Sequence, residues 1–174
     1  MTPINPNRAI LEYAAEKLAV NLAQVTRCAR SLSTEQLWFR TNPNTNSVGN
    51  LLLHLTGNVR QWIIGGVGEQ TIHRDRPAEF AQRNPSPVEQ ILPPLEETVR
   101  TAIDILTHFD PSRLGESRTI QGYETSVAVA VLHVVEHFSF HTGQIVHITK
   151  EILDVDLSLY DRQGHKIDRN DLKP

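Results

Sequence analysis

The sequence has only one cysteine, Cys28, among its 174 residues. A single thiol excludes an internal disulfide framework and any cysteine-rich zinc site. Because Cys28 falls within the first predicted helix, we interpret it as a small core residue rather than a reactive thiol. A metal site in this chain must therefore use other side chains.

Strong charge and long apolar runs are also missing. The formal net charge is −3, and no basic stripe with interleaved aromatic residues is present, which argues against a nucleic-acid-binding surface. No apolar run is long enough to span a bilayer. Residues 1–6 lack the basic region and apolar run of a signal peptide. We therefore expect a cytoplasmic protein with no nucleic-acid and no membrane partner.

The apolar residues instead follow the period of amphipathic helices. A first helix is predicted over Pro6–Ser31, with a short helical turn after Ser33. Ser47 can cap a second helix, which is expected to end at the glycine pair 65–66. Residues 68–85 are polar and are expected to form a long irregular connection.

A third helix is predicted to begin at the sequence Ser86-Pro87-Val88-Glu89, with Ser86 as its N-cap. The prolines at 93–94 should bend or interrupt this helix, and 110–111 should end it. Residues 118–124 suit a short extended piece, and the proline-free segment 125–153 predicts a fourth helix. The polar tail from about residue 154 is expected to be irregular.

Amphipathic helices without a convincing alternating strand predict an all-α fold, an antiparallel four-helix bundle. The length suits a single domain over residues 1–174. The long connection before the third helix would permit a crossover, so a simple up-and-down order is not assumed.

The chemistry of the chain centres on three histidines of the fourth helix, His133, His137 and His141. Histidines four residues apart lie on one helix face, where two imidazoles can reach one metal ion. All three cannot, because the outer two are about 12 Å apart along the axis. His141 lies about 40° from the centre of the apolar stripe, His137 about 80° and His133 about 120°. The expected pair is therefore His137 and His141, with His133 peripheral.

A third ligand must come from another helix, and the second helix offers His54 on the flank of its apolar stripe. Asn58 and Gln61 share that side by their spacing and could line a pocket or orient the imidazoles. Three neutral histidines with open positions are typical of a catalytic metal site. The alternative is that these histidines are satisfied core residues.

Three segments resemble the DinB-like (DinB/YfiT) superfamily: NSVGNLLLHL at 46–55, HVVEHFSFHTGQ at 133–144, and RDRPAEF at 74–80, which resembles an uncharacterised subfamily. The resemblance implies a four-helix bundle, commonly a homodimer, with one divalent ion, zinc or nickel, on three histidines. By position these are His54, His137 and His141. The sequence departs from the common pattern at Phe140 and Thr142, where many relatives have histidine and arginine.

Relatives in that superfamily include thiol transferases and metal-dependent hydrolases. The resemblance therefore implies an enzyme whose metal activates a low-molecular-weight thiol for transfer to an electrophilic small molecule. Gln144 could orient a ligand, and Arg74 and Arg76 could clamp an anionic substrate, although a solvated loop paired with Asp75 and Glu79 is an equally good interpretation. The alternatives are a hydrolase that uses metal-bound water and a non-enzymatic metal-binding or ligand-binding stress protein.

Overall fold

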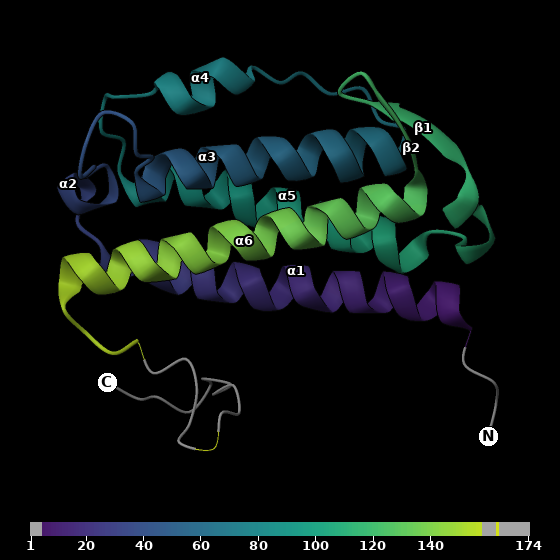
Figure 1. Cartoon of the computed structure of the whole chain (residues 1–174), viewed down its shortest axis with the longest axis horizontal. Helices are drawn as coiled ribbons and strands as arrows, with labels where there is room; N and C mark the ends of the chain where they lie inside the picture. Colours follow the sequence, from purple (N-terminus) through teal and green to yellow (C-terminus); the bar gives the residue numbers. More distant parts are fainter. Residues whose placement is uncertain (1–4, 158–162, 164–174) are drawn as a thin grey trace.

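In the computed structural model, which describes residues 5–157 and 163, long helices lie side by side as a bundle (Figure 1). They are α1 (Pro6–Ser31), α3 (Val48–Val59) with its continuation η1 (Arg60–Val67), α5 (Val88–His108) and α6 (Val127–Leu153). Fully buried side chains from each of them, such as Leu18, Leu55, Leu95 and Phe138, fill the core between them. The predicted all-α bundle is confirmed.

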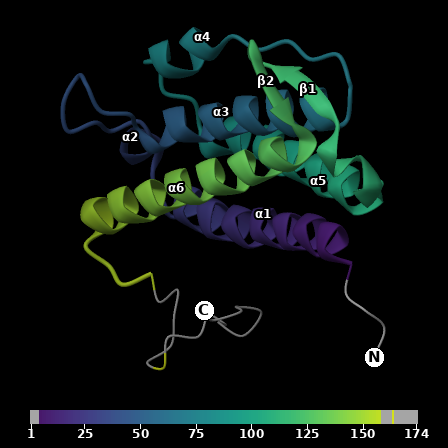
Figure 2. The ribbon, with the colours of Figure 1, turned by 45° about the vertical axis from the view of Figure 1, so that its right-hand side comes forward.

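The bundle does not follow a simple up-and-down order. α1 packs against α5 and α6, and α3 packs against the same two helices. Near the start of α1, Arg8 donates a hydrogen bond to the carbonyl of Thr107 at the end of α5, so α1 and α5 are antiparallel. The chain returns along the outside of the bundle between α3 and α5, which leaves those two helices parallel (Figures 1 and 2). The crossover that the long connection permits is therefore present.

α1 has the bounds that its periodicity predicts. The side chain of Asn5 accepts hydrogen bonds from the backbone N–H groups of Asn7 and Arg8 and so caps the helix. Cys28 is fully buried, as expected, and burial raises the pKa of its thiol. A four-residue helix, α2 (Thr34–Leu37), follows with a capping box on Ser33.

α3 does not stop at the glycine pair, contrary to the prediction. Ser47 caps α3 as expected, but the chain continues as the π-helix η1 to Val67. A Cβ atom on Gly65 or Gly66 would press into the side chain of Ile72 or Ile120. These glycines therefore allow close packing and do not terminate the helix. The wider π-helical turn carries Trp62, a residue of the candidate site.

The connection 68–85 is not wholly irregular, which corrects a second prediction. It contains a short helix, α4 (Arg76–Ala81), which lies outside α3 (Figure 1). The side chain of Asp75 accepts the N–H of Ala78 and caps α4. Asn50 of α3 donates hydrogen bonds to the carbonyls of Glu79 and Gln82, at 2.8 and 3.2 Å, which fastens α4 to the bundle.

α5 differs from its prediction at two places. Its N-cap is Pro87 rather than Ser86, and the helix runs through Pro93 and Pro94 without interruption. Both prolines are exposed, so water can reach the backbone carbonyls that they leave without helical partners. The buried neighbours Leu92 and Leu95 hold this part of α5 against the core.

The extended piece predicted over residues 118–124 is instead the centre of a β-hairpin, with a tight turn inside it. After a 3₁₀ helix, η2 (Pro111–Gly115), the antiparallel strands β1 (Ser117–Ile120) and β2 (Tyr123–Ser126) pair directly. Gln121 and Gly122 both have positive φ, 58° and 82°, which suits the tight turn between right-twisted strands.

Two further expectations concern membranes and the tail. Within the described part of the chain, every helix is too short or too polar to cross a membrane. α6 ends at Leu153, and Asp154 adopts a left-handed conformation after it. Apart from residue 163, the tail beyond residue 157 lies outside the described residues.

Candidate metal site

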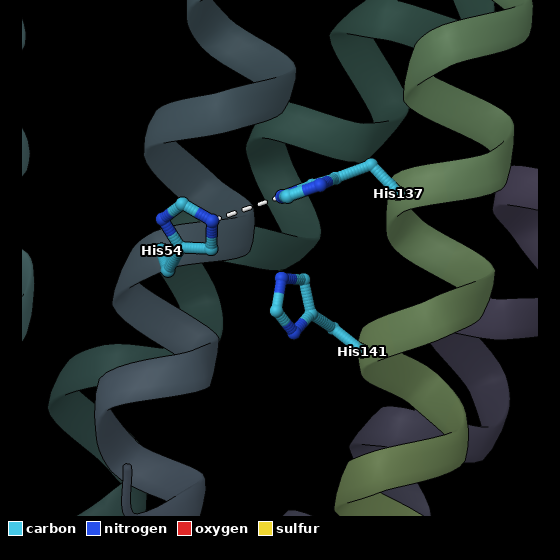
Figure 3. Close-up of side chains that lie close together, drawn as sticks. All are labelled: His54, His137 and His141. Carbon is cyan, nitrogen blue, oxygen red and sulfur yellow. Dashed lines mark hydrogen bonds between the residues drawn. The ribbon is translucent and has the colours of Figure 1, made fainter. Parts of the chain in front are cut away.

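The structure brings together the three histidines His54, His137 and His141. α3 supplies His54, and α6 supplies the other two one turn apart. One nitrogen of each imidazole lies within 4.8 Å of the nitrogens from the other two. The three rings point toward one another between the two helices (Figure 3). A tetrahedral ion with bonds of about 2.05 Å separates its ligand atoms by about 3.3 Å, so these nitrogens are within reach of one ion.

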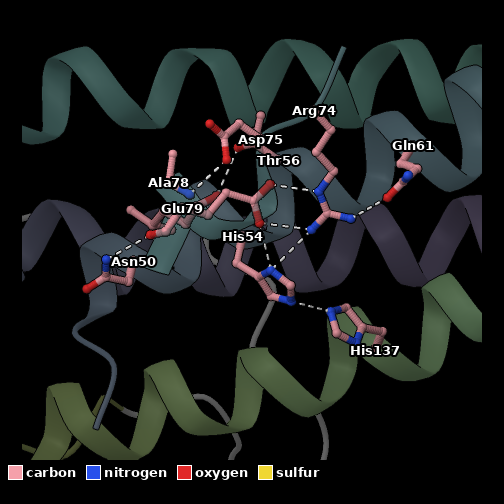
Figure 4. Close-up of polar contacts among 10 residues, drawn as sticks. Asn50, His54, Thr56, Gln61, Arg74, Asp75, Ala78, Glu79 and His137 are labelled. Carbon is pink, nitrogen blue, oxygen red and sulfur yellow. Dashed lines mark hydrogen bonds and ion pairs between the residues drawn. The ribbon is translucent and has the colours of Figure 1, made fainter. Parts of the chain in front are cut away.

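His54 is oriented from behind by Glu79 of α4. Its Nδ1 lies 2.9 Å from Oε2 of the Glu79 carboxylate (Figure 4). An ionised carboxylate only accepts hydrogen bonds, so Nδ1 carries the proton and Nε2 is left with its lone pair. Nε2 of His54 faces His137. A carboxylate behind a histidine in this way is the usual support of a metal-binding imidazole.

Arg74 keeps that carboxylate ionised. Its Nε and Nη2 donate to the two oxygens of Glu79 at 2.7 and 2.9 Å, and its Nη1 donates to Gln61 at 2.7 Å. Burial alone would raise the pKa of Glu79, but the hydrogen bonds from Arg74 and His54 outweigh burial and lower that pKa. Nη2 of Arg74 also lies 3.2 Å from Nδ1 of His54, but both nitrogens are donors, so we assign their hydrogen bonds to Glu79.

Gly57 provides the space for this ion pair. A Cβ atom at Gly57 would overlap Oε1 of Glu79 and lie 2.7 Å from Nε of Arg74. The side chains of Arg74 and Glu79 are only 5% and 10% exposed, so neither can swing freely into solvent. Glycine is therefore required here for close approach between α3 and the ion pair.

The two histidines of α6 are held in their neutral forms. Burial lowers the pKa of His137 to about 3, and the nearby imidazoles of His141 and His54 act in the same direction. Burial also lowers the pKa of His141, although the bond to Gln144 acts in the opposite direction. That bond, 2.7 Å from Nδ1 of His141 to the amide oxygen of Gln144, places the proton on Nδ1 and leaves Nε2 as the free lone pair.

His54 and His137 make one direct contact between their ring nitrogens. Their Nε2 atoms lie 2.9 Å apart. Two neutral lone pairs cannot meet at that distance, so either a proton or a cation must lie between the two atoms. Since Nδ1 of His54 carries its proton, Nε2 of His137 donates its N–H to Nε2 of His54, and a bound divalent ion would take the place of that proton.

An open cavity of about 390 Å³ adjoins the histidines. The residues that line it are His54, Asn58, Trp62, Arg74, Arg76, Gln121, Tyr123, His133 and His137. A larger hollow of about 660 Å³, lined by Glu35, Phe39, Ile148 and others, lies away from the three histidines. The smaller cavity is the one that a reaction at the imidazoles would use.

The structure places the other predicted site residues in different roles. Gln144 contacts His141 directly, and Gln61 contacts Arg74. Arg74 is buried against Glu79, so its predicted role as a substrate clamp is replaced by that ion pair, while Arg76 remains at the cavity.

Among the remaining histidines, His147 is exposed, as expected. His133 is half-buried rather than fully peripheral, and its ring lies 4.2 Å from that of Trp62.

Comparison with known proteins identifies the family. The model of a family described as protein of unknown function (DUF1572) matches residues 5–160. The chain belongs to this family. No curated protein sequence matches the DUF1572 chain.

Two crystal structures share the fold of this DUF1572 protein. A DinB-like protein from Bacillus cereus is 13% identical, with a TM-score of 0.65, over 81% of this chain and 91% of that one. A conserved protein from Enterococcus faecalis is also 13% identical, with a TM-score of 0.67, over 83% of this chain and 97% of that one. The fold that the sequence resemblance implies is therefore confirmed as DinB-like.

Sequence reasoning missed Glu79 as a partner of the site. The signal was present in part: Asp75, a proline at 77 and Glu79 form a helix start, which would have placed Glu79 in a first helical turn. Its contact with His54, 25 residues away, depends on how α4 packs on α3 in this DUF1572 protein. The sequence alone gives no measure of that packing.

Proposed function

We propose that this DUF1572 protein binds one divalent metal ion through His54, His137 and His141, and that it is an enzyme that activates a small thiol. The observation that carries the proposal is the convergence of three imidazole nitrogens within 4.8 Å, with hydrogen bonds to Glu79 and Gln144 that fix the tautomers of His54 and His141 and with burial that lowers the pKa of His137. Neutral imidazoles are the form that binds zinc or nickel. Bound there, the ion would lower the pKa of a small thiol and hold it as a thiolate at neutral pH.

The composition of the cavity supports an external nucleophile. Its lining residues, as far as the structure describes them, include neither a cysteine nor a carboxylate. The carboxylate of Glu79 is committed to His54 and Arg74, and Cys28 is buried in the core. The absence of a thiolate or carboxylate from this described lining favours a nucleophile that enters from solution, as a low-molecular-weight thiol does.

The role of the protein's own residues follows from this arrangement. Glu79 and Gln144 fix the tautomers of His54 and His141, which keeps one lone pair of each imidazole directed into the site. The ion pair with Arg74 keeps Glu79 ionised. The cavity gives the two substrates a shared space beside the imidazoles.

Metal analysis and cobalt spectroscopy test the proposal. Untagged protein should contain about one divalent ion per chain, the stoichiometry of a single closed set of ligands. In cobalt-substituted protein, a small thiol should add a sulfur-to-metal charge-transfer band in the near ultraviolet at neutral pH, and His141→Ala should abolish that band. A fully metallated protein without any spectral response to thiols would contradict thiol activation and favour the hydrolase or binding-protein alternatives.

We also propose that the chain forms a homodimer. Val129, Leu132 and Phe140 are 50–63% exposed and lie on the outer side of α6, opposite its buried face. A second copy of the chain would cover these apolar side chains. Sedimentation equilibrium should give a dimer for the wild type and a monomer for Leu132→Glu, whereas a monomeric wild type would contradict this part of the proposal.

A further inference from the structure

The cavity beside the histidines has a positively charged rim connected to the site through aromatic contacts. The guanidinium of Arg76 lies 5.0 Å from the centroid of the Phe80 ring. The Phe80 ring lies 4.6 Å from the ring of His54. Arg76 is exposed and lines the cavity together with His54. A charged group bound by Arg76 would therefore lie next to the candidate metal site.

Aromatic ring contacts also connect the residues of α6 and η1 that line this cavity. The rings of His137 and His133 are stacked with centroids 5.5 Å apart, and His133 lies 4.2 Å from Trp62. Trp62 is 6% exposed and lines the same cavity as Arg76. The cavity is thus lined by an exposed arginine, a buried indole and imidazoles.

Two buried polar atoms of the cavity lining have no partner. Nε1 of Trp62 is a donor without an acceptor, and Oδ1 of Asn58 is an acceptor without a donor. Asn58 is 4% exposed and stands one turn before Trp62 on the same side of the chain, lining the same cavity. Buried polar atoms in folded proteins almost always have a partner, so an open donor and an open acceptor on one cavity wall indicate a ligand that supplies both.

The charges that line the cavity indicate whether that ligand is an anion or a cation. Its described lining contains Arg74, Arg76 and three histidines, and no carboxylate. Arg74 is neutralised by Glu79, which leaves the guanidinium of Arg76 as the net charge at the mouth. A volume of about 390 Å³ accommodates a small organic molecule. These features together favour a small anion with hydrogen-bonding groups.

We propose that this cavity binds a small organic acid that carries a hydrogen-bond donor next to its carboxylate, as 2-hydroxy acids and N-acyl amino acids do. Arg76 and the indole N–H of Trp62 hold the carboxylate, and Oδ1 of Asn58 accepts the neighbouring hydroxyl or amide proton. Arg76 and Asn58 are then specificity-determining residues. The inference names a substrate class for the proposed metal site and rests on that site, but its test reads binding rather than activity.

Calorimetric titration with three matched probes tests the inference. Lactate has the carboxylate and the donor, propionate lacks the donor, and lactamide lacks the charge. Lactate should bind about three- to tenfold more tightly than propionate, the difference expected from one neutral hydrogen bond, and about tenfold or more tightly than lactamide, the difference expected from a charge-assisted one. A Trp38→Phe protein leaves Trp62 as the sole tryptophan, and its fluorescence should change with lactate at the same midpoint.

Two variants and a control assign the contacts. Arg76→Gln should weaken lactate binding by about tenfold or more and leave lactamide unchanged. Arg83→Gln removes the same charge from an arginine outside the cavity and should leave lactate binding as it is in the wild type. Asn58→Leu should reduce lactate binding to the level of propionate without changing propionate.

Three results would overturn the inference. They are equal binding of lactate and lactamide, equal effects of the two arginine substitutions, and a lactate preference that disappears when the divalent ion is removed, since the ion alone would then explain recognition. Metal analysis of the same samples separates the two proposals. Protein without a bound ion that still selects lactate through Arg76 supports the anion site, whereas untagged protein that takes up no divalent ion when one is supplied contradicts the metal site.

Discussion

Nδ1 of His54 donates a hydrogen bond to Oε2 of Glu79 at 2.9 Å, and this bond determines which nitrogen of His54 faces α6. α4, which carries Glu79, thereby becomes part of the candidate site although it supplies no imidazole. Arg74 and Gly57 support the same carboxylate, one by charge and the other by leaving space. The orientation and the tautomer of His54 therefore depend on residues from three segments of the chain.

Glu79→Gln should weaken divalent metal binding by about 10- to 100-fold, because the amide is a poorer acceptor and can present an N–H to His54 instead. Competition with a chromophoric chelator measures the change. The substitution also leaves Arg74 buried without a counter-charge, which should cost about 3–5 kcal/mol of the free energy of unfolding. Glu89→Gln, an exposed carboxylate of α5, is the matched control and should change neither quantity.

The ligand set itself can be tested by single substitutions. Alanine at His54, His137 or His141 should remove most of the bound metal, whereas His133→Ala should leave occupancy near that of the wild type. The reason is geometric: the first three present nitrogens within 4.8 Å of one another, whereas the ring of His133 packs against Trp62 and is not part of that group. Elemental analysis after dialysis gives the occupancies. Loss of metal in His133→Ala together with retention in His141→Ala would show that the assignment is wrong.

The helical periodicity of the sequence was sufficient to predict the bundle and to indicate that His137 and His141, rather than His133, face His54. α1 and the caps at Ser33 and Ser47 followed from local patterns, because those hydrogen bonds lie within one turn. The predictions failed where a distant contact decides the structure. The glycines at 65–66 read as a stop signal, yet packing against Ile72 and Ile120 gives them another role.

The residues that contact the three histidines also divide into local contacts, which the sequence predicts, and distant contacts, which it does not. Gln144 is three residues from His141, so their contact follows from one helical turn. Glu79 and Arg74 reach His54 only because Asn50 fastens α4 to the outside of α3. Trp62, whose Nε1 has no hydrogen-bond partner, lies in the π-helical turn η1. The periodicity of the sequence did not predict that turn.

Gly57→Ala should disturb the site without touching any imidazole. The added methyl group overlaps Oε1 of Glu79, so the carboxylate must shift away from His54. We expect weaker metal binding and a loss of about 1–3 kcal/mol in the free energy of unfolding, the usual cost of overpacking. Gly143→Ala on α6 is the control, because a Cβ there meets open space. It should raise stability by about 0.5–1 kcal/mol through helix propensity. Equal effects of the two substitutions would show that the space at Gly57 is not required.

The metal-free protein should lose stability as the pH falls below about 6.5. An unfolded histidine takes up a proton near pH 6.5, whereas His137 in the folded protein does so only at a pKa of about 3, and the pKa values of His133 and His141 are also lowered. Between these values the unfolded chain binds more protons than the folded one. The free energy of unfolding therefore falls with decreasing pH. Urea denaturation of the metal-free protein at pH 7.5, 6.5 and 5.5, a window above the usual titration of carboxylates, measures this slope.

Two comparisons assign the slope to the site. His137→Gln should flatten it, because the buried group that resists protonation is gone, whereas His147→Gln, at an exposed position, should leave it unchanged. Metal-loaded protein should be more stable at pH 7.5 and should lose that advantage as the pH falls, since protons compete with the ion for the same imidazole nitrogens. If metal-free protein is equally stable at pH 7.5 and 5.5, the imidazoles of α6 are not held neutral by burial.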